Sequence, residues 1–186
     1  MVQQEKNMMP SNATSQISKR KRFDLRRLVA DIAIELREIL EARRLYGDIS
    51  ISKDTPRYLM SDPYLLKNIF LALVNHSLRF LKSGGITIRI FTDSYATDKQ
   101  KHIHLTITDT SLGFLPEEID DIFRPHVQHR PATDKNYIMP DLFRARELAR
   151  SIGGDVSVQN VFGWGTMYSF SIAAQEATMP FDNISN

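Results

Sequence analysis

The sequence predicts an α+β protein, a two-layer sandwich in which helices cover one face of a mixed, mostly antiparallel sheet. Two long stretches in the first half repeat apolar residues every three or four positions, which is typical of helices with one buried face. Shorter stretches, most of them in the second half, alternate apolar and polar residues as strands do. Because these strands follow one another at hairpin spacing, one helical layer on one sheet would bury both apolar faces.

The first predicted helix begins after Asp24, whose side chain can cap the unpaired N–H groups of a helix start, and it ends near Tyr46. Its core-facing residues, at spacings of three and four, are Leu25, Leu28, Val29, Ile32, Leu36, Ile39 and Leu40. Two short strands are expected next, around residues 49–51 and 58–60.

The second long helix has a strong start signal, because Asp62 can occupy its N-cap and Pro63 its first turn. It is expected to run to about Lys82 and to stop before the glycine pair that follows. Its apolar side, which we expect to be buried, consists of Leu65, Leu66, Ile69, Phe70, Leu73, Val74, Leu78 and Leu81.

The second half of the chain alternates strands with shorter helices. Strands are expected over residues 86–92 and 102–109, followed by a short helix over 117–123. Residues 124–139 have no apolar periodicity and contain two prolines, so they predict a long mobile loop. A helix over 140–152, with glycines at its far end, completes the helical layer.

Two strands close the predicted fold, over residues 155–159 and 166–173, so the domain is expected to span residues 23–174. Residues 1–22 are polar, lack periodicity and carry five basic residues against one acidic residue, which predicts a disordered basic lead. Residues 175–186 are expected to form a polar tail.

Asp109 ends its strand at a position where the alternation points inward, on the same side as Leu105 and Ile107. A buried carboxylate is costly unless hydrogen-bond donors surround it. Two interpretations follow from the residues alone. Asp109 either caps the turn that follows the strand, or it faces a ligand in a half-buried pocket.

A polar stripe accompanies the apolar side of the second long helix. It consists of Asn68, Ala72, Asn75, His76 and Arg79, at spacings of three or four. Such a stripe is usually a solvated surface. Because it joins two amides, an imidazole and a guanidinium near the end of a helix, it can also serve a polyphosphate and its Mg²⁺, an ion that prefers oxygen ligands.

Composition and charge exclude several classes of function. The formal net charge is +2, and the residues after the basic lead sum to −2, so the basic residues form an arm rather than a nucleic-acid-binding face. The run Lys19–Arg22 is interpreted as a solvated linker, with contact to phosphates or lipid headgroups as the alternative. The absence of cysteine excludes disulfides and Cys-ligated zinc. No apolar run approaches the roughly 18 residues of a membrane span, so a cytoplasmic protein is expected.

The order of these motifs resembles the catalytic, ATP-binding domain of sensor histidine kinases, within the wider family of gyrase, heat-shock chaperone, histidine-kinase and MutL ATPases (GHKL) and its Bergerat-type fold. The resemblance covers residues 23–173. It implies that Asp109 is the aspartate of the DxGxG motif, which reads the adenine amino group, and that Gly113 is the second glycine of that motif. The Gly-x-Gly-Thr motif of the closing hairpin matches Gly163, Gly165 and Thr166.

The metal-binding helix departs from the pattern of this family. Aligned on Arg79 and Phe80, the two asparagines of the family's N-box fall on Ala72 and His76. The second asparagine is the usual Mg²⁺ ligand, whereas a neutral imidazole is a poor ligand for that ion. Asn75 lies about 100° round the helix from that position and could substitute only with a register shift.

Two glycine motifs are altered as well. Ser111 replaces the first glycine of DxGxG, and the glycine-rich lid motif falls on residues 137–141, which contain no glycine. Glycines in the lid let backbone N–H groups close on phosphates, whereas Asp141 would add a negative charge beside them. The adenine end of the site is therefore expected to be kept and the phosphate end to be lost.

The resemblance and these departures together predict a degenerate ATP-binding domain that acts in two-component-type signalling as a protein-interaction or pseudokinase module. Its expected partner is a response regulator, a phosphotransfer protein or a kinase. ATP or ADP is expected to bind weakly or not at all, and any residual affinity should be nearly independent of Mg²⁺. No catalytic residue and no metal ligand is predicted. The cofactor-binding candidates are Asp109, Gly113, Thr166, Asn75, His76 and Arg79.

Two other functions stay open from the sequence. One is a working ATP-Mg²⁺ site that phosphorylates a partner in trans, which would depend on positioning and charge neutralisation. The other is a nucleic-acid or membrane adaptor that works through Lys19–Arg22 and binds polyanions in a salt-dependent manner. The helical hairpin that carries the phosphoaccepting histidine in such kinases is not expected within the 22 residues before Phe23.

Overall fold

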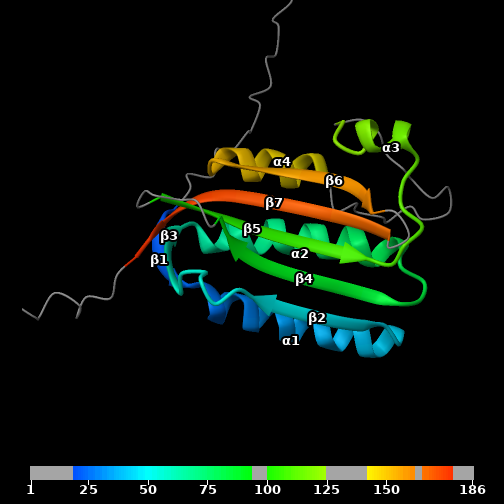
Figure 1. Ribbon diagram of the computed structural model, residues 1–186, viewed down its shortest axis with the longest axis horizontal. Coiled ribbons are helices and arrows are strands. Elements are labelled where there is room, and N and C mark those ends of the chain that lie inside the picture. The colour runs from blue at the N-terminus through cyan, green and yellow to red at the C-terminus, as the bar shows by residue number, and fades with distance from the viewer. Residues whose placement is uncertain (1–18, 94–99, 125–141, 162–164, 178–186) are drawn as a thin grey trace, which may run out of the picture.

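The computed structural model describes residues 19–93, 100–124, 142–161 and 165–177, which form a mixed sheet with the long helices packed against it (Figure 1). The predicted α+β fold class is confirmed. Of the helices in these ranges, none is both long enough and apolar enough to cross a lipid bilayer.

The helices are α1 (Leu25–Arg43), α2 (Pro63–Phe80), α3 (Pro116–Asp121) and α4 (Leu142–Ser151). The strands are β1 (Lys21–Asp24), β2 (Tyr46–Ile51), β3 (Tyr58–Ser61), β4 (Gly85–Thr92), β5 (Gln100–Asp109), β6 (Gly154–Val161) and β7 (Gly165–Glu176). Within the described ranges their order in the sheet is β1-β3-β7-β5-β4-β2, and β6 also pairs with β7. The β2–β4 pair is parallel and the other pairs are antiparallel, in agreement with the predicted mixed sheet.

Both long helices begin at the predicted caps. Asp24 Oδ1 accepts hydrogen bonds from the second and third backbone N–H groups after it, and Asp62 Oδ1 does the same for α2. Helix α1 ends earlier than predicted, because Arg44 adopts a left-handed conformation (φ 57°) that turns the chain into β2. Helix α2 likewise ends at Phe80, two residues before Lys82.

The limits of the predicted domain change at both ends. β1 begins at Lys21, so Lys21 and Arg22 lie in a strand paired with β3 rather than in the disordered lead expected over residues 1–22. β7 runs to Glu176, because its last residues also pair with β3, and it therefore extends into the polar tail expected over residues 175–186. Polar side chains concealed both extensions. β1 lies at the edge of the sheet, where a strand needs few apolar residues, and β7 ends in two polar, exposed residues, Gln175 and Glu176.

Several predictions fall outside the described residues. They are most of the loop over residues 124–139, the lid motif over 137–141, and Gly163 of the closing hairpin. The predicted helix over 140–152 is described from Leu142 onward, as α4.

The hydrophobic core lies between the helices and the sheet. Every apolar residue predicted for the buried side of α2 is buried, and so are the inward positions of β5. In α1 the prediction is wrong for Ile39, which is 40% exposed, while Leu36 and Leu40 beside it are buried. The helical period shows which residues share the apolar face of a helix. It does not show which residues at the margin of that face are covered by the sheet.

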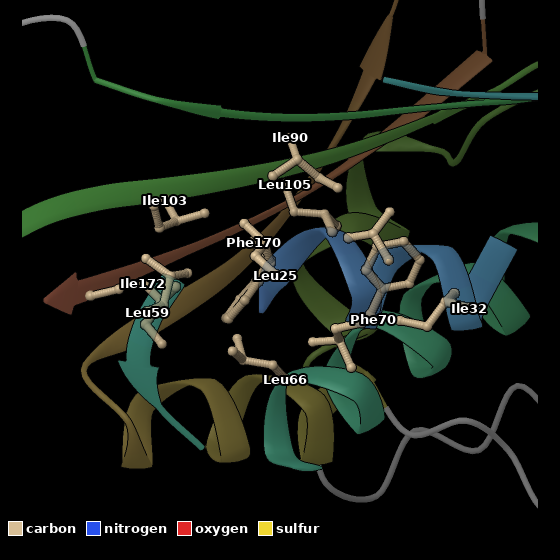
Figure 2. Close-up of a pocket in the computed structure, with 13 residues that line it drawn as sticks. Leu25, Ile32, Leu59, Leu66, Phe70, Ile90, Ile103, Leu105, Phe170 and Ile172 are labelled. Carbon is tan, nitrogen blue, oxygen red and sulfur yellow. The ribbon is translucent and has the colours of Figure 1, made fainter. Parts of the chain in front are cut away.

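A small apolar cavity of about 30 Å³ lies in this core (Figure 2). Figure 2 shows that side chains of α1, such as Leu25 and Ile32, and of α2, such as Phe70, meet strand side chains around it. The walls contain almost no polar surface, so the cavity offers a water molecule no hydrogen-bond partner and is a packing gap.

Candidate functional site

Asp109 is the last residue of β5, and its side chain is fully buried, as the alternation of the strand predicted. Its Oδ1 accepts hydrogen bonds from the backbone N–H groups of Ser111 (3.0 Å) and Thr166 (3.2 Å). The Ser111 hydroxyl also donates to Oδ1, at 2.6 Å. Oδ2 accepts the hydroxyl of Ser77 on α2, at 2.7 Å. These four donors compensate the burial of the carboxylate.

The structure supports the capping interpretation of Asp109 directly, because Ser111 in the following turn donates twice to the carboxylate. Ser111 stands where the family has the first glycine of DxGxG. The hydroxyl that replaces the glycine hydrogen donates its hydrogen bond to the Asp109 carboxylate. A ligand that donates a hydrogen bond to Asp109 must therefore displace one of these donors, or bind a carboxylate oxygen that already accepts a hydrogen bond from the protein.

Two glycines set the course of the loops around Asp109. Gly113 has φ +83°, and a Cβ there would lie 2.6 Å from Asn160 Oδ1. The same amide clamps the next residue, since Oδ1 accepts from Phe114 N (2.9 Å) and Nδ2 donates to Phe114 O (2.6 Å). Gly165 has φ +122°, and a Cβ there would collide with the carbonyl oxygen of Asp109. Both positions therefore require glycine.

His76 lies in α2 but is only 2% exposed. Its Nδ1 is 3.1 Å from the hydroxyl of Tyr168 on β7. Its ring also packs against the rings of Phe80 and Phe114, with centroid distances of 5.2 and 5.9 Å. Burial, assisted by the charge of Asp109, raises the pKa of Tyr168, so the phenol keeps its proton at neutral pH.

The residues at this helix position do not fit a Mg²⁺ ion. Mg²⁺ prefers oxygen ligands in octahedral geometry and keeps several waters. The position offers instead an imidazole enclosed by aromatic rings, and Ala72 one turn earlier offers no ligand at all. Across the residues that the structure describes, no group of three or more His, Cys, Asp or Glu side chains is placed to hold a metal ion.

The other residues of the predicted polar stripe do not form one surface with His76. Asn75 is exposed, and Asn68 and Arg79 are half-buried. The guanidinium of Arg79 lies over the ring of Phe80, 5.5 Å from its centroid, and partial burial lowers the pKa of Arg79 from its ordinary value. Asn75 and His76 thus occupy different sides of α2, and the structure does not bring them together.

Thr166, by contrast, contacts Asp109 directly, and Gly113 lies against Asn160, the residue that pairs with Thr166 in the sheet. Thr166 is fully buried, and besides its backbone bond to Asp109 its hydroxyl lies 3.1 Å from that of Ser111. The candidate residues therefore separate into a connected group round Asp109 and a dispersed group on α2.

Four residues of this region were not among the candidates predicted from the sequence: Ser77, Phe114, Asn160 and Tyr168. Two of them carried a signal, because Ser77 is a hydroxyl within the apolar side of α2 and Tyr168 is one within the apolar alternation of β7. Phe114 and Asn160 carried none, since they are 46 residues apart and meet only in the folded chain.

Known proteins show which family this chain belongs to. The family described as histidine kinase-, DNA gyrase B-, and HSP90-like ATPase matches residues 61–176. The aerobic respiration control sensor protein ArcB of Escherichia coli is 25% identical over 134 residues, which cover 69% of this chain and 16% of ArcB. The sensor protein GacS of Pseudomonas syringae is 24% identical over 160 residues, covering 83% of this chain and 17% of GacS. The chain spans about one sixth of the length of these curated relatives.

Solved structures show the same fold. Full-length ShkA in complex with AMPPNP superposes with a TM-score of 0.71 at 19% identity, covering 87% of this chain and 32% of ShkA. The nucleotide-free catalytic domain of the histidine kinase ThkA gives a TM-score of 0.64 at 15% identity, covering 83% of this chain and 95% of that domain. Because the family match takes in more than half of the chain, this chain belongs to the histidine kinase-, DNA gyrase B- and HSP90-like ATPase family.

Proposed function

We propose that this chain is a degenerate histidine-kinase-like domain that acts in two-component-type signalling as a protein-interaction or pseudokinase module and binds nucleotide weakly or not at all. The observation that carries the proposal is the burial of His76 against Tyr168, at the helix position where the family has a metal-ligating asparagine. Phosphoryl transfer depends on positioning and on neutralising phosphate charge, and neither Ala72 nor His76, at the two N-box positions, offers Mg²⁺ an oxygen ligand.

The hydrogen bonds of Asp109 support the same conclusion at the adenine end. Both carboxylate oxygens are engaged by donors from the protein, three on Oδ1 and one on Oδ2. An adenine amino group would have to compete with the Ser77 hydroxyl for Oδ2, which lowers the net gain from that contact.

The relatives suggest the setting in which such a module would act. ArcB and GacS are sensor proteins, and ThkA has been solved in complex with the response regulator protein TrrA. By analogy, the partner of this chain would be a response regulator, a phosphotransfer protein or a true kinase, met in the cytoplasm.

A second function has specific support. Asp109 is buried where the family reads adenine, and Gly113 and Gly165 keep conformations that require glycine. The likeness to ShkA, which was solved with AMPPNP, fits a working ATP-Mg²⁺-dependent kinase domain that phosphorylates a partner in trans.

Calorimetric titration with ATP and ADP, each with and without Mg²⁺, separates the two functions. The proposal expects weak or absent binding, nearly equal for ATP and ADP and nearly independent of Mg²⁺. If ATP-Mg²⁺ bound at least about tenfold more tightly than metal-free ATP, a gap of about 1.4 kcal/mol, the kinase function would replace it. Asp109→Asn is the matched variant, because any affinity that depends on reading adenine should fall by about 1.5–3 kcal/mol.

A further inference from the structure

One edge of the sheet carries an unusual density of positive charge. Six of the nine residues from 19 to 27 are lysine or arginine, and one, Asp24, is acidic. All six are exposed, on β1, just before it, or in the first turn of α1 that follows it. We call this group the basic edge; it consists of Lys19, Arg20, Lys21, Arg22, Arg26 and Arg27.

The basic edge is not explained by the stability of the elements that carry it. The first turn of α1 contains no acidic residue, and Arg26 and Arg27 there face the positive end of the helix dipole, which is unfavourable. Asp24 caps that helix and is paired with Arg57 at 2.8 Å, which lowers the pKa of Asp24 despite some desolvation. Cations on an edge strand such as β1 can prevent edge-to-edge pairing with another sheet. That role does not explain Arg26 and Arg27, which lie in α1.

β1 also has an open side. It pairs with β3 and lies at the end of the sheet order, and within the described ranges no strand pairs with its other side (Figure 1). An edge strand presents unpaired backbone N–H and C=O groups, to which an extended peptide can add as a further strand.

Two observations favour a peptide over a nucleic acid. The aromatic ring beside the edge, Tyr58, is already covered by the guanidinium groups of Arg22 (5.6 Å to the centroid) and Arg57 (5.3 Å), so it is not open for stacking on a base. β1 has four residues, about 13 Å of strand, which spans few phosphates of a duplex but matches a short added strand.

We propose that β1 is a docking strand for an extended acidic segment of a partner protein, which pairs with the open side of β1 and sets its carboxylates beside the basic edge. This inference rests on the proposed function, since it names the chemistry of the partner that a protein-interaction module would bind.

Fluorescence anisotropy with a labelled 12-residue peptide of alternating glutamate and threonine tests the proposal on the full chain. The triple variant Lys21→Glu/Arg26→Glu/Arg27→Glu should weaken binding at least about tenfold, because it reverses charge next to the probe. It should not harm folding, because glutamate is favourable at positions 26 and 27 in the first turn of α1, and Lys21 is exposed on an edge strand. The control, Arg37→Glu/Arg89→Glu/Arg144→Glu, makes the same change in net charge at exposed positions away from the edge and should alter binding less than about twofold.

A second peptide of the same charge, with every threonine replaced by proline, tests strand pairing. Proline removes backbone donors, so this peptide should bind at least about fivefold more weakly. Equal binding of the two peptides, equal loss in both triple variants, or no binding of the first peptide would overturn the proposal. So would tighter binding of a single-stranded or duplex DNA of equal charge, or of phosphatidylserine vesicles.

These outcomes differ from failure of the proposed function. Tight, Mg²⁺-dependent ATP binding together with peptide binding at β1 would support the docking strand. It would overturn the pseudokinase function in favour of the kinase function. Weak nucleotide binding without peptide binding would support the pseudokinase and overturn the docking strand.

Discussion

Ser77 and Asp109 form a hydrogen bond of 2.7 Å between two side chains that are both fully buried. The hydroxyl comes from α2 and the carboxylate from the end of β5, so the bond ties the helical layer to the sheet. Ser77 donates to Oδ2, whereas the described donors from the turn and from β7 all bind Oδ1.

Ser77→Ala should lower the free energy of unfolding by about 1–3 kcal/mol, because it leaves Oδ2 buried without this donor. Urea denaturation at neutral pH measures the change. The control is Ser157→Ala on β6, where the side chain is exposed and the effect should stay within about 0.5 kcal/mol. Equal effects of the two changes would mean that water replaces the hydroxyl at Asp109.

Restoring the N-box should create Mg²⁺ dependence. The variant Ala72→Asn/His76→Asn returns both amides, and adding Tyr168→Phe removes the hydroxyl that would lose His76 as its partner. ATP should then bind more tightly with Mg²⁺ than without it, by a factor that calorimetry can resolve, although the altered lid sequence should still prevent turnover. The matched control, Tyr168→Phe alone, should show no Mg²⁺ dependence. If the variant folds and behaves like this control, the lost metal site does not lie at these two positions.

Val29→Ile should stabilise the protein, by about 0.5–1 kcal/mol, because Val29 lines the apolar cavity and one added methylene can occupy part of it. The same change at Val156, which is fully buried in β6 and does not line that cavity, should destabilise by about 1–3 kcal/mol through overpacking. Thermal or urea unfolding of both variants measures the difference. Destabilisation by both would show that the cavity has no room for a methylene in the required direction.

The ion pair between Arg146 and Asp155 should make stability pH-dependent at acid pH. The hydrogen bond from Arg146 Nε (2.9 Å) lowers the pKa of Asp155 below its ordinary value of 3.8. Because the folded pKa is the lower one, the stabilisation is present above 3.8 and is lost as pH falls through the folded value. Asp155→Asn should therefore cost about 0.5 kcal/mol near neutral pH, where the pair is half-exposed, and nothing at a pH below both pKa values.

Unfolding curves between these pH limits, with Glu147→Gln as the exposed control, give the readout. A constant gap between Asp155→Asn and the unmodified protein at every pH would assign the effect to packing rather than to charge.

The elements that sequence analysis predicted well are those with strong local signals. Asp24 and Asp62 predict where their helices begin, because an N-cap side chain accepts hydrogen bonds from N–H groups only two and three residues away. The burial of Asp109 followed from the period of two along β5. Such signals need no knowledge of distant contacts.

The parts that sequence analysis could not predict depend on contacts across the fold. His76 was placed on a polar stripe, yet its neighbour from β7, Tyr168, encloses it from 92 residues away. Lys21 and Arg22 have the composition of a disordered arm, and pairing with β3 alone makes them a strand. Charge density marked that segment correctly as unusual, but only the sheet order shows that it lies along an edge.

The pairing between β3 and β7 has a mechanical consequence. In the described part of the chain it consists of two residue pairs, Leu59 with Glu176 and Met60 with Gln175, whereas β5 and β7 share ten. One further hydrogen bond, from Ala177 N to Tyr58 O, joins β3 to the chain just after β7, so the corner formed by β1 and β3 has few backbone bonds to the rest of the sheet. We therefore expect this corner to open at a lower free energy than the β5–β7 pair. Since Leu25 N donates to Arg57 O beside β3, such a local opening would disturb the start of α1. A load applied to β1 would thus reach the helical layer first and the centre of the sheet last.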